Sequence, residues 1–515
     1  MKLFSAQHMH SVDQETILAG ETGLELMTRA VRKLAGELLF FAEGRQIPLC
    51  VFVGPGNNGG DGLGLACELA QRGWMVELRL CVAAEKIKGD ALHFLTQAQS
   101  LGLPIHDFSK EDAWKRPERF LSSGTWLVDA LLGTGSAGIP RGSVGRAITF
   151  LQQQQPRHLI WAVDLPSGLD PDEGKPFDPA LCVTADYTLC LGGPKRGMVA
   201  SEAVNWCGSI SVLDLGFDDE LLLQKSEGPH QVLSDKEAAS LIPRLHRGAH
   251  KGSKGHALLV GGSLGMTGAI SLSAKAALRS GCGLVSVMTP AGVAGIVDAA
   301  VPEALVNVGK QGRFGSLCAQ DIPFVNYDAV GVGPGLRLNL DSRELLLRIL
   351  KENMAPLVLD ADALNVLATF SEEERPCEAE LWVTPHPGEM ARLLNVSVAE
   401  VEKDRYHSAE QCSTLFGAHV LLKGAGSICR DREGELWVNV NGNPGMATGG
   451  AGDVLTGILT GLLAQGVDHH MALPLAVYLH GRAGDLAAQR KGILGMLAGD
   501  IVDALPEVMR QLQGR

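Results

Sequence analysis

The chain alternates short apolar runs, glycine-rich turns and stretches with helical apolar spacing. In the first half, the apolar run 48–53 leads into a glycine-rich loop at 54–62, a helical stretch at 63–71 and a second apolar run at 75–80. Short apolar runs bounded by turn residues are typical of buried strands. Strand, loop, helix and strand in this order predict a βαβ unit. A longer helical pattern precedes it at 12–39.

Three later apolar runs of the first half end on polar residues. The run 126–128 is followed by Asp129, the run 159–163 by Asp164 and Ser167, and the run 187–191 by a glycine turn that contains Lys195. The carboxyl ends of parallel strands lie along one edge of a sheet, where ligands bind. We therefore expect these residues and Asn58 to converge. Any one of them could instead be a turn residue that bonds its own backbone, but four such ends together weaken that alternative.

The glycine loop at 54–62 is a weaker signal. Gly54, Gly56 and Gly59 fit the G-x-G-x-x-G pattern of dinucleotide-binding proteins, but a structural turn would explain that match equally well. No Lys-Ser or Lys-Thr pair follows, so this is no Walker loop. The amides of Asn57 and Asn58 suit a cation or a polar ligand.

The regular pattern fades at 218–229, where we place a linker between domains at 1–218 and 219–515. The second half repeats the alternation, with apolar runs that begin near 257, 329, 356, 381 and 419. This pattern predicts a second doubly wound α/β domain.

The stretch 441–453 is dense in glycine and runs into an apolar helical pattern at 454–463. A helix start leaves backbone N–H groups unpaired, and with the helix dipole they form an anion site. Gly449, Gly450 and Gly452 let an anion approach the backbone closely. Asp453 then has two interpretations, a helix cap or a general base. The loop alone favours the cap slightly, and the rest of the chain favours the base.

Two further strand ends carry candidate binding residues. His386 lies between two prolines on a stiff turn, where binding and structural roles are equally well supported. Lys423 opens a tight glycine turn, a position that favours contact with a phosphate or a nucleotide. Asp360, Asp362 and Asn365 could help to position a metal or a helix start, but a structural role is favoured.

Composition narrows the class of partner. The chain has 515 residues, 45% of them apolar, and a net charge of −13, which argues against non-specific binding of nucleic acid. The eleven cysteines are an odd number without a C-x-x-C pair, which indicates reduced cytosolic thiols. The start lacks a signal peptide, and no apolar run is long enough to span a membrane. We expect a cytoplasmic protein without membrane or nucleic-acid partners.

Together, these motifs resemble a known family. Residues 441–455 with 251–263, 331–336, 384–389 and 423–427 resemble the carbohydrate-kinase-like dehydratase domain of NAD(P)H-hydrate repair enzymes. Residues 54–62, 129–138, 163–170 and 192–197 resemble the epimerase domain that is fused ahead of it in bacteria. The resemblance implies an α/β protein with a Rossmann-like three-layer α/β/α domain followed by a ribokinase-like α/β domain. It also implies two activities, an isomerase that interconverts R- and S-NAD(P)HX and an ADP-dependent lyase that dehydrates the S form.

The resemblance also implies site residues. The substrates NADHX and NADPHX would contact, in the first domain, Asn57, Asn58, Gly59, Gly60, Asp61, Gly133, Thr134, Gly135, Ser136, Ala137, Gly138, Ile139 and Asp164. A potassium ion would bind Asn58, Asp129 and Ser167. In the second domain the substrate would contact Ala257, Gly333, Gly335, His386 and Asp453, and the nucleotide would contact Lys423, Gly424, Ala425, Gly426, Ser427 and Gly452.

Our mechanistic hypothesis makes Asp453 the base of dehydration, with Mg²⁺ and ADP as cofactor and co-substrate, and Asp164 the acid–base group of epimerisation. We also expect a homo-oligomer. A small-molecule kinase of the ribokinase superfamily would explain the second domain but not the first. A nucleotide sensor without turnover is disfavoured by the acid at Asp453, and a dehydrogenase fits the Asn-Asn-Gly-Gly-Asp continuation poorly.

Overall fold

The computed structural model describes residues 2–155, 157–200, 203–320, 322–375 and 377–514. The chain divides into two compact units, 1–235 and 236–515, which are described one at a time. The domain limits expected from the sequence, 1–218 and 219–515, stay a prediction. The segment expected to be an irregular linker instead contains a helix and a strand, α7 (Asp219–Lys225) and β9 (Glu227–Gln231). Asp218 caps α7 by accepting hydrogen bonds from the N–H groups of Glu220 and Leu221.

The first unit is built on a seven-stranded sheet in which all neighbouring strands are parallel, in the order β4-β3-β2-β5-β6-β7-β8. Its strands are β2 (Leu49–Val53), β3 (Val76–Leu80), β4 (Ile105–Asp107), β5 (Trp126–Ala130), β6 (Ile160–Val163), β7 (Tyr187–Leu191) and β8 (Ser209–Leu213). A separate short strand, β1 (Lys2–Leu3), pairs antiparallel with β9. The helices are α1 (Ala6–Leu18), α2 (Gly23–Ala42), α3 (Asn57–Gln71), α4 (Gly89–Ser100), α5 (Gly142–Gln154), α6 (Val204–Cys207) and α7.

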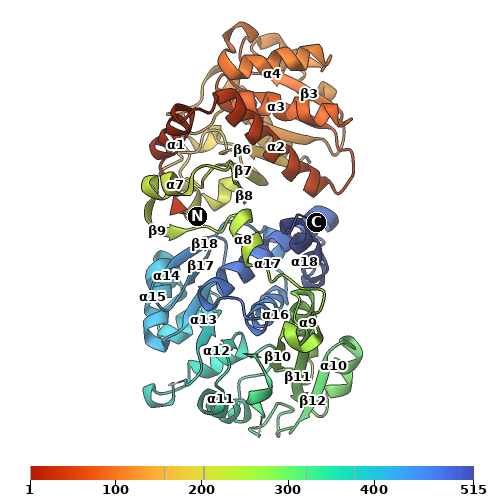
Figure 1. Cartoon of the computed structure of the whole chain (residues 1–515), viewed down its shortest axis with the longest axis vertical. Helices are drawn as coiled ribbons and strands as arrows, with labels where there is room; N and C mark the ends of the chain where they lie inside the picture. The colour runs from red at the N-terminus through yellow and green to blue at the C-terminus, as the bar shows by residue number, and fades with distance from the viewer. Residues whose placement is uncertain (1, 156, 201–202, 321, 376, 515) are drawn as a thin grey trace. The chain divides into compact units, whose positions relative to one another are not determined.

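Alternation along the strands builds two cores, one on each face of the sheet. In β2, Leu49, Val51 and Val53 join one cluster with α2, α3 and α4. Figure 1 shows these three helices lying together. Cys50 and Phe52 point to the opposite face, where they pack with α5. Period-two alternation with both faces apolar is typical of a covered parallel sheet. The predicted three-layer α/β/α arrangement of the first domain is confirmed.

Two helix boundaries differ from the sequence prediction. The pattern at 12–39 forms two helices, because the chain turns at Gly20 (φ 114°) and Thr22 then caps α2 in a capping box with Glu25. The helix expected at 63–71 begins six residues earlier, at Asn57. The residues Asn57–Asp61 therefore form the first turns of α3 rather than a loop.

The strand order defines where a ligand would bind in the first unit. From β2 the chain proceeds outward through β3 to β4, and then returns to the other side of β2 as β5. The carboxyl ends of β2 and β5 therefore lie side by side at a topological switch point, where open α/β sheets bind ligands. α3 follows β2, and Asp129 lies on β5.

The described residues of the second unit form nine strands in the order β18-β17-β16-β15-β14-β13-β10-β11-β12. The strands from β10 to β16 are parallel, and β16, β17 and β18 are antiparallel. Their bounds are β10 (His256–Val260), β11 (Leu284–Pro290), β12 (Leu305–Gly309), β13 (Ala329–Val332), β14 (Leu357–Leu359), β15 (Leu381–Val383), β16 (His419–Leu422), β17 (Ser427–Arg430) and β18 (Leu436–Asn439).

The helices of this unit are α8 (Asp235–Leu241), α9 (Thr267–Arg279), α10 (Ala294–Ala300), α11 (Leu340–Glu352), α12 (Asp362–Leu367), α13 (Pro387–Leu394), α14 (Val398–Lys403), α15 (Arg405–Phe416), α16 (Ala451–Ala464), α17 (His469–Lys491) and α18 (Ala498–Leu512). α16 is buried between α9, α17 and the strands β10 and β13 (Figure 1). Its apolar residues all round explain this position. Among the described residues, no helix is both long enough and apolar enough to cross a membrane.

Candidate functional site

The residues predicted to bind a cation meet beside the switch point of the first unit. The Ser167 hydroxyl donates to Asp129 Oδ1 (2.6 Å), and the Ser167 N–H donates to Asp129 Oδ2 (2.8 Å). Asn58 Nδ2 donates to the carbonyl of Leu132 (3.0 Å), whose own N–H donates to Ser167 Oγ (2.9 Å). Three segments far apart in the sequence are thus tied together around Asp129.

This cluster is rich in oxygen atoms, and among the described residues no cationic side chain acts on Asp129. Burial raises the pKa of Asp129 to about 6, although three hydrogen bonds from Ser167 and Leu131 act to lower it. No charged side chain contributes to that shift. Asn58 Oδ1 is buried and accepts no hydrogen bond from the described residues. An unpartnered amide oxygen beside a buried carboxylate is the donor set that a hard cation prefers.

Asp164 lies at the end of β6 in a strained backbone conformation. Its φ is 66°, and the Leu165 N–H donates to the Val163 carbonyl (2.8 Å), which makes Asp164 the centre of a rare γ-turn. Asp164 Oδ1 accepts hydrogen bonds from the Leu191 N–H (3.2 Å) and from the Lys195 ammonium. Strain of this kind is kept where the surroundings enforce it, commonly at functional sites.

The remaining predicted residues of the first unit form the walls of this region. Asp61, in the second turn of α3, is buried, and burial raises the pKa of its carboxyl well above the ordinary value. The loop 133–139 follows β5, and a Cβ added at Gly133 would lie 3.2 Å from Asn58 Cβ. Gly133, Ser136 and Gly138 face the loop 165–169 across a small cavity. The predicted residues Thr134, Gly135, Ala137 and Ile139 lie in the same loop, and Ile139 is exposed.

In the second unit, Lys423 lies close to Gly452. Lys423 follows β16, whereas Gly452 is in the first turn of α16. Lys423 Nζ donates to Asp360 Oδ1 (2.6 Å), and a Cβ added at Gly452 would lie 3.4 Å from Lys423 Nζ. Thr456, one turn into α16, donates to Asp360 Oδ2 (2.5 Å). The largely buried Asp360 therefore positions the lysine against the helix start. The sequence interpretation favoured a structural role for Asp360 and did not link it to Lys423.

Asp453 is in the first turn of α16, next to that lysine. The N-cap of α16 is Gly450, with φ 95°, and no side chain caps the helix. The interpretation of Asp453 as the cap is therefore wrong. Burial raises the pKa of Asp453 to about 6, the charge of Asp360 adds to the rise, and Lys423 opposes it. A carboxyl with a pKa near neutrality is suited to proton transfer.

His386 and Glu389 begin the neighbouring helix, α13. His386 is its N-cap, and its Nδ1 accepts hydrogen bonds from the N–H groups of Gly388 (3.0 Å) and Glu389 (3.4 Å). The imidazole is half exposed, so it remains accessible to a ligand as well as structural. Glu389 is buried 3.9 Å from Lys423, and burial raises the pKa of its carboxyl to about 7. The sequence interpretation did not single out Glu389.

Gly333 and Gly335, which are predicted to contact the substrate, have backbone conformations and close contacts that leave no room for a side chain. Gly333 has φ 130°, and Gly335 has φ 66°. A Cβ added at these positions would lie 1.8 Å from the Asp360 carbonyl oxygen and 2.5 Å from the Met266 carbonyl oxygen, respectively. Ala257 is buried in β10. In the turn 423–427, Ser427 Oγ donates to the Gly424 carbonyl (2.8 Å), Ala425 lies between, and Gly426 has φ 64°.

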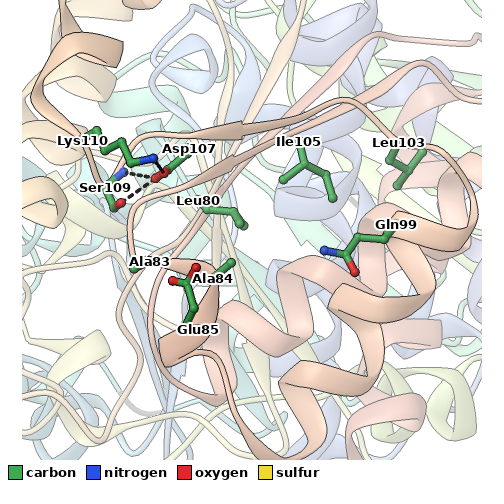
Figure 2. A pocket seen from close by; sticks show the side chains of 10 residues that line it. All are labelled: Leu80, Ala83, Ala84, Glu85, Gln99, Leu103, Ile105, Asp107, Ser109 and Lys110. Carbon is green, nitrogen blue, oxygen red and sulfur yellow. Dashed lines mark hydrogen bonds and ion pairs between the residues drawn. The ribbon is translucent and has the colours of Figure 1, made fainter.

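One cavity lies apart from all of these residues. It has a volume of about 480 Å³ and lies against β3, β4 and the end of α4 (Figure 2). Three charged residues line it, Glu85, Asp107 and Lys110. Asp107 and Lys110 are paired with each other at 3.0 Å, and Ser109 also donates to Asp107. None of the predicted site residues lines it.

The chain has two doubly wound α/β units, each with a candidate site. The first unit has an oxygen-rich cluster at its switch point, and the second has a lysine and a carboxyl at a glycine-lined helix start. These features define a two-site nucleotide enzyme. Comparison with known proteins supports this class. The family described as "YjeF-related protein N-terminus" matches residues 23–197, and that described as "NAD(P)H-hydrate dehydratase" matches residues 257–507.

Curated relatives match nearly the whole chain. The bifunctional NAD(P)H-hydrate repair enzyme of Moorella thermoacetica is 37% identical over 96% of this chain and 93% of its own length. The enzymes of that name from Coxiella burnetii and Escherichia coli are 35% and 34% identical over 97% and 95% of this chain, and over 97% and 90% of their own lengths. The chain belongs to the family of bifunctional NAD(P)H-hydrate repair enzymes.

Among solved structures, the ADP/ATP-dependent NAD(P)H-hydrate dehydratase of Bacillus subtilis is 30% identical, with a TM-score of 0.49, and covers 55% of this chain and 98% of its own. The family match across both units does not support the alternative of a kinase with an accessory domain.

Proposed function

We propose that the first unit interconverts R- and S-NAD(P)HX and that the second dehydrates S-NAD(P)HX with ADP, which yields NAD(P)H, AMP and phosphate. The observation that supports the second activity best is the placement of Lys423 against Gly452, directly beside Asp453. An ammonium and a row of free helix N–H groups bind phosphates, and a carboxyl of raised pKa can deprotonate a hydroxyl.

The hydroxyl of the hydrated nicotinamide is a poor leaving group. Asp453 accepts its proton while the hydroxyl oxygen attacks the terminal phosphorus of ADP, and AMP leaves. The ring nitrogen then donates its electron pair, the C–O bond breaks, and phosphate departs. Loss of the neighbouring C–H proton restores the dihydropyridine. The N–H groups at the start of α16 and Lys423 stabilise charge on the transferred phosphoryl group.

The charges of this site fit a divalent cation. Asp360, Glu389 and Asp453 lie around the ammonium of Lys423, and Arg392 also acts on Glu389. Among these described groups the carboxylates outnumber the cations, so bound phosphates would add to an excess of negative charge. Glu389 is the carboxylate that could hold Mg²⁺, directly or through water, while Asp453 acts as the base. When bound, Mg²⁺ supplies positive charge to the phosphates.

The first site fits potassium on separate grounds. The unpartnered Asn58 Oδ1, the Asp129 carboxylate and Ser167 Oγ would hold it, and its charge would orient the substrate's polar groups. Asp164 acts on the hydroxyl that leaves and returns. A homo-oligomeric state and a cytoplasmic location stay predictions.

One assay tests both activities. Purified protein is incubated with S-NADHX and ADP, and the return of dihydronicotinamide absorbance is recorded; R-NADHX alone, followed by chromatography, reports epimerisation. We expect both reactions in the wild-type protein and expect Asp164→Ala to lose epimerisation alone. Nucleotide consumption that depends on a sugar, without repair of NADHX, would refute the proposal.

A further inference from the structure

The cluster around Asp164 contains two groups to which the proposed epimerisation has not yet assigned a role. Lys195 is 1% exposed, and its ammonium donates to Asp164 and to the Leu191 carbonyl (3.1 Å). A buried ammonium in contact with a carboxylate stabilises the ionised form of that carboxylate. Asp13, on α1, is the second group.

The first helix is docked against the loop that carries Lys195. The Phe4 N–H donates to the Pro194 carbonyl (3.0 Å), and the Arg196 N–H donates to the Phe4 carbonyl (2.8 Å). Phe4, Met9 and Val12 are buried in one cluster. Asp13 follows Met9 by four residues, so the two side chains lie on the same face of α1. Asp13 is accordingly only partly exposed.

Asp13 lies within electrostatic reach of the Asp164–Lys195 pair. Burial raises the pKa of Asp13 to about 6, Lys195 opposes the rise, Asp164 adds to it, and His10 on the same helix lowers it. Asp61, from α3, interacts with the same three groups. Three carboxyls from three different elements therefore share one ammonium.

We propose that Asp13 is a further proton-transferring residue of the epimerase site and that Lys195 is the positioning residue that sets Asp164 opposite it. The proposal rests on the proposed epimerase function. It adds to the site a helix that lies outside the residues 23–197 matched by the N-terminal family.

The reaction balances with these two carboxyls. The protonated Asp13 gives its proton to the substrate hydroxyl, the C–O bond breaks with release of water, and the electron pair of the ring nitrogen forms a C=N bond. Water then attacks the same carbon from the other face, the nitrogen recovers its pair, and the Asp164 carboxylate takes the excess proton. Proton exchange with solvent returns Asp13 to its protonated form and Asp164 to its carboxylate form. In the reverse reaction, Asp164 is the acid and Asp13 is the base.

The test uses the full chain with Asp13→Asn, and Glu15→Gln as the matched control. Glu15 is on the same helix and pairs instead with Lys225 at 2.6 Å. The conversion of R- to S-NADHX is measured, together with ADP-dependent dehydration of S-NADHX as a control for the second unit. We expect Asp13→Asn to lower kcat for epimerisation by about 10²–10⁴-fold with a smaller change in KM, while dehydration stays unchanged.

The pH profile separates proton transfer from a structural role. The wild-type rate should fall as Asp13 loses its proton above its pKa of about 6, and Asp13→Asn should lose that limb. Lys195→Met removes the ammonium that holds Asp164 and should lower kcat for epimerisation with a smaller change in KM. Asp13→Glu keeps a titrating carboxyl and should recover part of the rate. Epimerisation by Asp13→Asn within threefold of wild type, or an equal loss with Asp13→Glu, would overturn the proposal. Absence of epimerisation in wild type and Glu15→Gln alike would instead refute the proposed function.

Discussion

Replacing Asp453 by asparagine should remove dehydration while making the second unit more stable at neutral pH. The substitution keeps the size of the side chain, and it removes no helix cap, because the N-cap of α16 is Gly450. It removes the carboxylate that we assign as the base. We expect kcat for dehydration to fall by about 10²–10⁴-fold, the usual contribution of a general base.

The stability change follows from the raised pKa of Asp453. The rise from 3.8 to about 6 means that the folded state binds the proton more tightly than the unfolded state. Each pKa unit corresponds to about 1.4 kcal/mol, so the upper limit is about 3 kcal/mol. Because the side chain is partly solvated, we expect about 1–2 kcal/mol.

The sign is set by proton linkage. Below pH 3.8 the carboxyl is protonated in both states and resembles asparagine. As the pH rises from about 4 to 6, the unfolded state loses its proton first, so the wild-type chain loses stability relative to the variant. The advantage of Asp453→Asn should grow across this window and stay constant above it.

The assay combines denaturant unfolding of both proteins at several pH values with dehydration kinetics. Asp503→Asn is the matched control, since it removes an exposed carboxylate from α18 of the same unit. Turnover of Asp453→Asn within threefold of wild type would refute the base assignment. A stability difference that does not change between pH 4 and 7 would refute the electrostatic argument.

Three more substitutions probe separate parts of the two sites. Lys423→Met should leave the buried Asp360 without its cation and lower the free energy of unfolding by about 3–5 kcal/mol. It should also weaken ADP binding, which calorimetry measures. Retained ADP affinity would contradict the nucleotide role of Lys423. Gly335→Ala places a Cβ 2.5 Å from the Met266 carbonyl at φ 66°, so we expect a loss of about 1–3 kcal/mol, whereas Gly499→Ala, with nothing within 4 Å, should be neutral. Asn58→Ala removes the unpartnered amide oxygen, so epimerisation should no longer depend on potassium. The measurement is a titration with potassium chloride against choline chloride. Dehydration of S-NADHX should persist.

Local sequence signals predicted both fold classes and the places where polar residues converge. Short apolar runs and helical spacing are properties of neighbouring residues, so they predicted the strand–loop–helix order of both units and the strand ends at Asp129 and Asp164. A glycine that needs a positive φ is likewise a local requirement, as at Gly450 and Gly335. The resemblance to the repair family rested on such local motifs.

Long-range partners were decided only by the tertiary structure. Lys423 and Asp360 are 63 residues apart, and Thr456 is 96 residues from Asp360. The ends of β14 and β16, which lie on either side of β15, and the start of α16 nevertheless bring all three together. Sequence spacing carries no information on which strands become neighbours, so Asp360 was interpreted as structural. Asp13 reached the first site in the same way, because the docking of α1 depends on a buried apolar face rather than on any motif. Burial itself, which raises the pKa values of Asp13, Asp129 and Asp453, exists only once the sheet and its helices have excluded water.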